Sequence, residues 1–342
     1  MVGRASRLIR SSRALREPLR TVLTGIGVHR TGAKSDIAII SCRRSGSTWL
    51  MEMLAAQPRM RYVNEPFEQA YFARNGLPTG LESQLPAMQT KVVHVAPEHE
   101  QQFRRYLRDP RATRIMGPYD LFSPTWHPVT DRRVWKIVNA TAIAKWIDDQ
   151  QLGFDMVYLL RHPVPTVLSM ASSVALRAEA NLRNPAFVSQ FLEPSQEELG
   201  WELLRRGSTM QRFALEWCLD SMVPFRAVAT GGRDWLVMTY EELNLSPRDS
   251  VGLLSDRLAL TRPDKLLERM QVPSQSTAYG RIGAVEREDA LRRISRWVDK
   301  VSDGALWEIF EVIDAFGIDA YVPDSPLARP RWLHFPETLS GI

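Results

Sequence analysis

The chain has 342 residues but only two cysteines, Cys42 and Cys218, and it has no long apolar run. Two cysteines exclude a disulfide framework and a cysteine-rich zinc site, and their scarcity fits a reducing compartment. A membrane-spanning helix needs about 20 consecutive apolar residues, and no stretch approaches that length. We therefore expect a soluble or peripheral protein of the cytoplasm.

The net charge of +5 and the pI of about 9.3 favour anionic ligands. The main body has no lysine- or arginine-rich run, so we expect no nucleic-acid partner. Basic residues concentrate instead in residues 1–34, where Glu17 is the single acid. This segment has two open interpretations: a membrane-surface helix or targeting peptide, which Pro18 would interrupt, or a mobile basic tail.

From Asp36 onward, short apolar runs alternate with helical segments. Four runs are typical of buried parallel strands: residues 37–40, 134–138, 156–160 and 235–238. This alternation predicts a three-layer α/β fold, with a central, mostly parallel sheet flanked by helices. We expect residues 35–322 to form this domain, with an insert around 70–130 that covers the carboxyl edge of the sheet. Residues 196–229 are predicted to be helical throughout, and residues 323–342 form a C-terminal tail.

The loop after the first strand has the composition of an anion site. A helix begins with unpaired amides and a positive dipole end, and Arg44-Ser45-Gly46-Ser47-Thr48 stands where the strand gives way to a helix. Gly46 allows the backbone to approach a phosphate, while Arg44 and the hydroxyls add donors. A nucleoside-triphosphate loop would need a lysine before its Ser or Thr, and none is present. The plainer interpretation is a βα turn whose small polar residues cap the helix.

A second candidate anion site follows the strand at 156–160. Arg161 stands at the end of that strand, Pro163 or Pro165 can begin the next helix, and Ser169 lies in its early turns. Arg161 and Ser169 would then lie at the carboxyl edge of the sheet beside the first loop. Two separated phosphate sites suit a nucleotide that is phosphorylated at both its 5′ and 3′ positions.

Together these segments resemble the sulfotransferases that use 3′-phosphoadenosine 5′-phosphosulfate (PAPS). Segment 44–49 resembles the family's 5′-phosphosulfate loop, and Arg161-His162-Pro163 with Ser169 resembles its 3′-phosphate segment. Weaker matches, such as Tyr240-Glu241-Glu242-Leu243, extend the resemblance over most of residues 36–322. Arginine in place of lysine in the loop resembles the carbohydrate-modifying and bacterial-type branch. The resemblance implies a P-loop-like fold and no metal requirement.

The resemblance also implies roles for individual residues. Those that would grip the 5′ end of PAPS are Arg44, Ser45, Gly46, Ser47 and Thr48. Arg161 and Ser169 would hold the 3′-phosphate. Trp49 would stack on or near the adenine; alternatively, it opens an apolar helix face and packs in the core.

The general base is expected at Glu65. Small-molecule sulfotransferases place a histidine shortly after a lysine, but Val138 stands where that histidine would fall after Lys136. Carbohydrate-type members use a glutamate in a Glu-Pro context, which Glu65-Pro66 matches. Lys136 would stabilise charge on the bridging oxygen. Plainer alternatives are an exposed strand-end carboxylate for Glu65 and a surface or helix-cap lysine for Lys136.

The reaction that the resemblance implies is sulfuryl transfer from PAPS to an acceptor hydroxyl or amine. The resemblance favours a carbohydrate or glycolipid as the acceptor, and a small hydrophobic alcohol stays open. Two other hypotheses stay open: a P-loop kinase-like phosphotransferase, which would need magnesium, and a nucleotide-binding protein related to the sulfotransferases that catalyses no transfer. The motifs identify neither the acceptor nor the oligomeric state.

Overall fold

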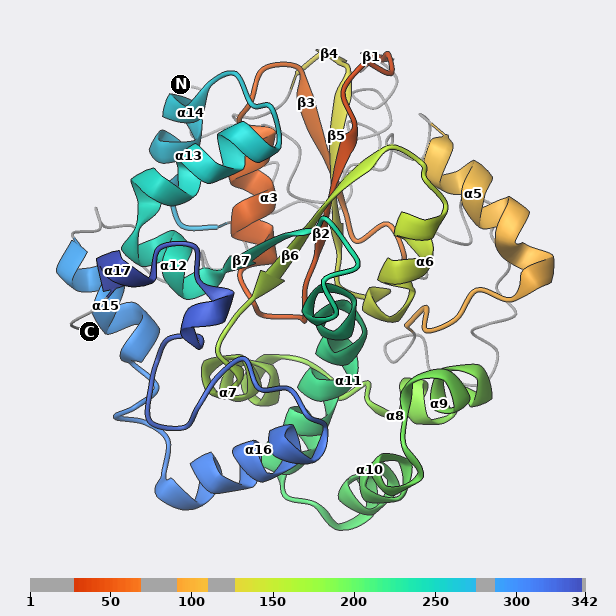
Figure 1. The fold of residues 1–342 in the computed structure, drawn as a ribbon, viewed down its shortest axis with the longest axis vertical. Helices are drawn as coiled ribbons and strands as arrows, with labels where there is room; N and C mark the ends of the chain where they lie inside the picture. Colours follow the sequence, from red (N-terminus) through yellow and green to blue (C-terminus); the bar gives the residue numbers. More distant parts are fainter. Residues whose placement is uncertain (1–27, 69–90, 110–126, 275–286, 340–342) are drawn as a thin grey trace, which may run out of the picture.

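The computed structural model describes residues 28–68, 91–109, 127–274 and 287–339. In these residues the main sheet has five strands, all parallel, in the order β3-β5-β2-β6-β7 (Figure 1). Its strands are β2 (Asp36–Ile40), β3 (Met60–Asn64), β5 (Arg132–Ile137), β6 (Phe154–Leu160) and β7 (Leu236–Thr239). A separate parallel pair, β1 (Val28–His29) with β4 (Val129–Thr130), lies beside it.

The apolar strands are buried on both faces because helices cover both sides of the sheet. In β2, Ile37 and Ile39 pack into one core, while Ala38 and Ile40 pack into the other. Strand side chains alternate between faces, so a strand in the middle layer must be apolar throughout. This confirms the predicted three-layer α/β fold.

One layer of helices packs on the face that holds Ile37 and Ile39. Its members are α3 (Ser47–Ala55), α12 (Tyr240–Leu245), α13 (Pro247–Arg257) and α14 (Pro263–Met270). The other face is covered mainly by α5 (Glu100–Arg108), α6 (Ala144–Asp149), α7 (Pro163–Ser173), α11 (Thr209–Ala229) and α16 (Asp303–Ala315). Figure 1 shows α3, α13 and α14 on one side of the sheet and α5 and α6 on the other.

Further helical segments complete the described part of the chain. They are η3 (Pro97–His99), η5 (Thr141–Ile143), α8 (Glu179–Leu182), α9 (Pro185–Phe191), α10 (Pro194–Arg206), α15 (Arg287–Ser295), η6 (Pro330–Trp332) and α17 (Pro336–Leu339). None of the helices in the described ranges is both long enough and apolar enough to cross a membrane.

The order of the strands creates a switch point at β2. The chain leaves β2 for β3 and β5 on one side, and then crosses β2 to form β6 and β7 on the other. The connections that follow β2 and β6 therefore diverge at the carboxyl edge, which is where open α/β sheets bind ligands. In Figure 1 these strand ends point toward α7.

The predicted strands are confirmed, but the prediction that residues 196–229 are helical throughout is wrong at one point. The chain breaks at Gly207 and Ser208, between α10 and α11. The Ser208 hydroxyl accepts from the Gln211 amide, and the Gln211 side chain accepts from the Ser208 amide. This capping box starts a new helix because it satisfies amides that would otherwise lack partners.

The predicted domain division stays a prediction. Of the basic segment 1–34, residues 1–27 lie outside the described residues, as do 69–90 and 110–126 of the predicted insert. The described part of residues 323–342 packs on α12, where the amides of His334 and Phe335 each donate to Glu242 Oε1 at 2.7 Å.

Candidate functional site

The loop between β2 and α3 has an unusual backbone. Arg44 and Gly46 both adopt left-handed conformations, with φ of 65° and 91°, and α3 begins directly after Gly46. A Cβ atom added to Gly46 would lie 2.5 Å from Cδ2 of Tyr240. Glycine is therefore required here by the backbone conformation and also by the close packing of the loop against Tyr240.

The two predicted anion sites lie in direct contact. Arg44 Nε donates to Ser169 Oγ at 2.9 Å, and Arg161 Nη1 donates to the Arg44 carbonyl at 2.8 Å. This contact follows from the sheet, because β2 and β6 are parallel neighbours and their carboxyl ends are adjacent. The structure thus brings together Arg44, Arg161 and Ser169 from segments more than 100 residues apart.

This cluster carries two guanidinium charges, and the charge of Arg161 acts on the buried carboxyl of Glu241 without a direct ion pair. Neither Arg44 nor Arg161 forms an ion pair within the described ranges, and Arg161 Nε is buried without a hydrogen-bond partner. Partial burial and the nearby charges of Arg161 and Arg43 lower the pKa of Arg44. Two neighbouring guanidinium groups with unfilled donor capacity form a site suited to a phosphate or sulfate.

Tyr240 shapes the cluster from the end of β7. The Arg161 guanidinium lies over its ring at 4.2 Å, and the Trp49 ring meets it edge-on at 5.8 Å. Trp49 is half-buried and packs against the core on the α3 face. Sequence reasoning singled out the segment 240–243 without giving Tyr240 a place in the site; its position directly after a strand was the available signal.

A buried network anchors His162, the residue that follows Arg161. The His162 amide donates to Glu241 Oε1 at 3.0 Å, and the Tyr321 hydroxyl donates to Glu241 Oε2 at 3.0 Å. The His162 ring stacks on Trp297 with centroids 4.4 Å apart. Burial lowers the pKa of His162 to about 3, so its ring is neutral at ordinary pH. Burial raises the pKa of Glu241.

The predicted catalytic pair is also assembled at this edge. Glu65 directly follows β3, and Lys136 lies on the neighbouring strand β5, where it is paired with Asn64. Lys136 Nζ lies 2.7 Å from Glu65 Oε1 and donates to Thr48 Oγ1 at 3.1 Å. Lys136 is therefore a buried link between the carboxylate and the loop, and not a surface lysine.

Glu65 has two further features of a functional group. Its φ of 53° is left-handed, a conformation that costs free energy for a residue with a side chain. Its second carboxylate oxygen, Oε2, is buried and has no hydrogen-bond partner among the described residues. One oxygen is thus fixed by Lys136, and the other keeps a free lone pair.

The remaining loop residues differ in exposure. Ser45 and Ser47 are buried, while Thr48 is half-buried and directs its hydroxyl toward Lys136. His94, His99 and His127, which lie in the predicted insert, are only partly buried. Across the described ranges, no three His, Cys, Asp or Glu side chains are grouped as metal ligands.

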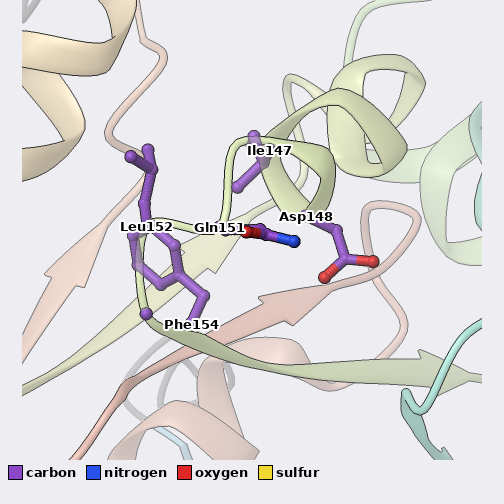
Figure 2. Close-up of a pocket in the computed structure, with 6 residues that line it drawn as sticks. Ile147, Asp148, Gln151, Leu152 and Phe154 are labelled. Atoms are coloured by element: carbon purple, nitrogen blue, oxygen red, sulfur yellow. The ribbon is translucent and has the colours of Figure 1, made fainter.

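A pocket lies at the opposite, amino-terminal end of β6 (Figure 2). Ile147 and Asp148 of α6 line it together with residues 151–154. Asp148 already accepts from Trp235 Nε1 at 2.9 Å and pairs with Arg233 at 2.8 Å. The pocket contains none of the predicted site residues.

Comparisons with known proteins were made on sequence and on structure. No family model matches the chain, and the search of curated proteins returned no match. The search of solved structures found a sulfotransferase domain from the olefin synthase of Synechococcus PCC 7002. It has 16% identity, a TM-score of 0.42, and coverage of 85% of this chain and 99% of that one.

Two further solved structures are similar at the same level. A sulfotransferase domain from the curacin biosynthetic pathway has 14% identity and a TM-score of 0.44, covering 84% of this chain and 99% of that one. The mouse sulfotransferase SULT7A1, complexed with PAP, has 12% identity and a TM-score of 0.38, covering 87% and 89%.

Proposed function

We propose that this protein is a sulfotransferase that moves the sulfuryl group of PAPS to an acceptor hydroxyl or amine, as on a carbohydrate or glycolipid. The observation that carries the proposal is the convergence of Arg44, Arg161 and Ser169 at the switch point of a parallel sheet. Within the described ranges the guanidinium groups of Arg44 and Arg161 form no ion pair with a carboxylate, and an anionic nucleotide would complete this arrangement.

The donor groups fit a nucleotide with phosphates at both ends. The loop at 44–48 and the first amides of α3 would hold the 5′-phosphosulfate. Arg161 and Ser169 would hold the 3′-phosphate, with Arg161 kept in place by its contact with the Tyr240 ring. Trp49, half-buried beside Tyr240, would border the adenine.

PAPS would supply the electrophilic sulfur and leave as 3′-phosphoadenosine 5′-phosphate (PAP). Glu65 would accept the acceptor's proton at Oε2, the oxygen that has no other partner in the described ranges. Lys136, between Glu65 and Thr48, would neutralise charge that develops on the oxygen bridging sulfur and phosphorus. The acceptor oxygen gains the sulfuryl group, the bridging S–O bond breaks, and the proton resides on Glu65.

Titration calorimetry of the full chain with PAP and with ATP, each with and without magnesium, tests this proposal. We expect PAP to bind without magnesium and much more tightly than ATP. Incubation of the protein with ³⁴S-labelled PAPS and a cell extract should then yield labelled products by mass spectrometry. Tighter binding of magnesium-ATP would favour a phosphotransferase, while tight PAP binding with no labelled product would favour a non-catalytic relative.

A further inference from the structure

A group of buried charges lies at the loop between β2 and α3. It consists of two cations, Arg43 and Lys91, and two carboxylates, Glu216 and Asp220, which stand one turn apart on α11. The side chains of all four are 8% exposed or less. Lys91 Nζ lies 2.6 Å from Asp220 Oδ1 and 3.7 Å from Glu216 Oε1.

Glu216 uses both of its oxygens to join separate parts of the site. Oε1 accepts from the guanidinium of Arg43, the residue that precedes Arg44 in the loop. Oε2 accepts from the backbone amide of Arg177 at 2.5 Å, just beyond the end of α7, the helix that carries Ser169. Arg43 also donates to the carbonyl of Ala175 at 2.8 Å, so the loop and this segment are tied twice.

The link continues toward the proposed catalytic pair. Arg177 Nη1 donates to Asn139 Oδ1 at 2.6 Å, and Asn139 lies three residues after Lys136. A single carboxylate therefore connects the loop after β2, the segment after α7 and the segment after β5. These are the three segments whose relative positions decide where donor and acceptor would meet.

Stability alone gives a poor account of this arrangement. Removing charges from water is costly, and buried ion pairs can often be replaced by apolar residues of similar volume without loss of stability. Although burial opposes ionisation, the charges of Lys91 and Arg43 lower the pKa of Glu216, so it is ionised at neutral pH. Burial raises the pKa of Asp220.

We propose that Glu216 is a positioning residue, which fixes the loop between β2 and α3 to the segment after α7 and thereby sets the distance between Arg44 and Ser169. It acts through Arg43 and the Arg177 amide and would not touch the nucleotide. Its role in nucleotide binding rests on the proposed function; its role in ordering the loop does not.

The test compares Glu216→Gln with Glu52→Gln in the full chain. Glu52 is a matched control because it is also a buried carboxylate paired with an arginine, Arg269, and it lies on α3, the helix that follows the same loop. For each variant, thermal unfolding, PAP affinity by calorimetry, and hydrogen exchange of the amides of residues 42–48 are measured.

We expect both variants to unfold at lower temperature. Glu216→Gln should also weaken PAP binding about tenfold or more and accelerate loop exchange, since a charge-assisted bond that orders the loop is lost. Glu52→Gln should keep wild-type loop exchange and an affinity within about twofold of wild type. Equal effects of the two variants on the loop, or unchanged loop exchange in Glu216→Gln, would overturn the proposal.

Two additions keep the test decisive. If Glu216→Gln does not fold, Arg43→Gln removes the other side of the same contact and should show the same faster loop exchange; normal exchange there would refute the positioning role. If the wild-type protein binds no PAP, the proposed function fails, while the exchange measurements still decide the role of Glu216.

Discussion

Arg161→Ala should weaken the binding of PAP far more than that of adenosine 5′-phosphosulfate, which lacks the 3′-phosphate. Hydrogen bonds to charged groups are each worth about 1.5–3 kcal/mol. At about 1.4 kcal/mol per tenfold change, losing one such bond weakens PAP about 10- to 150-fold. The donor is available because Nε of Arg161 is buried without a partner and Nη1 makes one contact, to the Arg44 carbonyl.

Structural side effects of this change need a control. Arg161 also lies over Tyr240, so its removal would loosen the loop for both nucleotides. Arg226→Ala is the matched control, because Arg226 Nη1 likewise donates to a backbone carbonyl, that of Phe191 at 2.6 Å, on a different part of the molecule. It should leave both affinities unchanged.

The assay is titration calorimetry of the wild-type protein, both alanine variants and Arg161→Lys. Lysine keeps the charge but loses the planar fork of donors, so its loss of PAP affinity should fall between those of wild type and alanine. If Arg161→Ala weakens both nucleotides by the same factor, Arg161 does not read the 3′-phosphate and the two-phosphate argument fails.

Three other changes have defined outcomes. Glu65→Gln should retain PAP binding but lower the turnover of a labelled acceptor by a factor of about 10²–10⁴. Glu68→Gln, three residues away, should leave turnover unchanged, and unchanged turnover in Glu65→Gln would remove Glu65 from the mechanism. Gly46→Ala should abolish PAP binding, whereas Gly153→Ala, which has φ of 75° but no atoms within 4 Å of its new Cβ, should only lower stability; equal PAP affinity in both would show that the loop adapts. His162→Phe should flatten the pH dependence of unfolding between about pH 6.5 and 3, measured by urea denaturation. Burial lowers the folded pKa of His162 to about 3, so between these pH values the unfolded chain binds a proton that the folded chain does not. The free energy of unfolding of the wild type therefore decreases by about 1.4 kcal/mol for each unit by which the pH is lowered. An unchanged slope in His162→Phe would show that His162 titrates normally.

The fold could be predicted from the sequence because its strands are short apolar runs. Residues 37–40 carry no polar side chain, and only a strand covered on both faces can bury every one of them. The prediction that residues 196–229 are helical throughout was wrong at Gly207 and Ser208, where the side chains of Ser208 and Gln211 cap the start of a new helix.

The two anion-binding segments of the candidate site could also be predicted, because each is a pattern of neighbouring residues in the sequence. Arg44 and Gly46 stand in a strand–loop–helix junction, and Arg161 stands at the next such junction. Their contact follows once β2 and β6 are neighbours in a parallel sheet. Whether these residues bind PAPS stays a prediction that calorimetry decides.

Local sequence determined where the loop lies and which residues it contains, since strand burial and helix initiation depend on nearby residues. Only the tertiary structure decided that Arg43 faces inward while its identical neighbour Arg44 faces Ser169. That choice depends on Glu216, a carboxylate 173 positions further along the chain, which reaches the loop because α11 packs against the sheet. A buried charge needs a partner of opposite sign, and the fold alone brings that partner within reach.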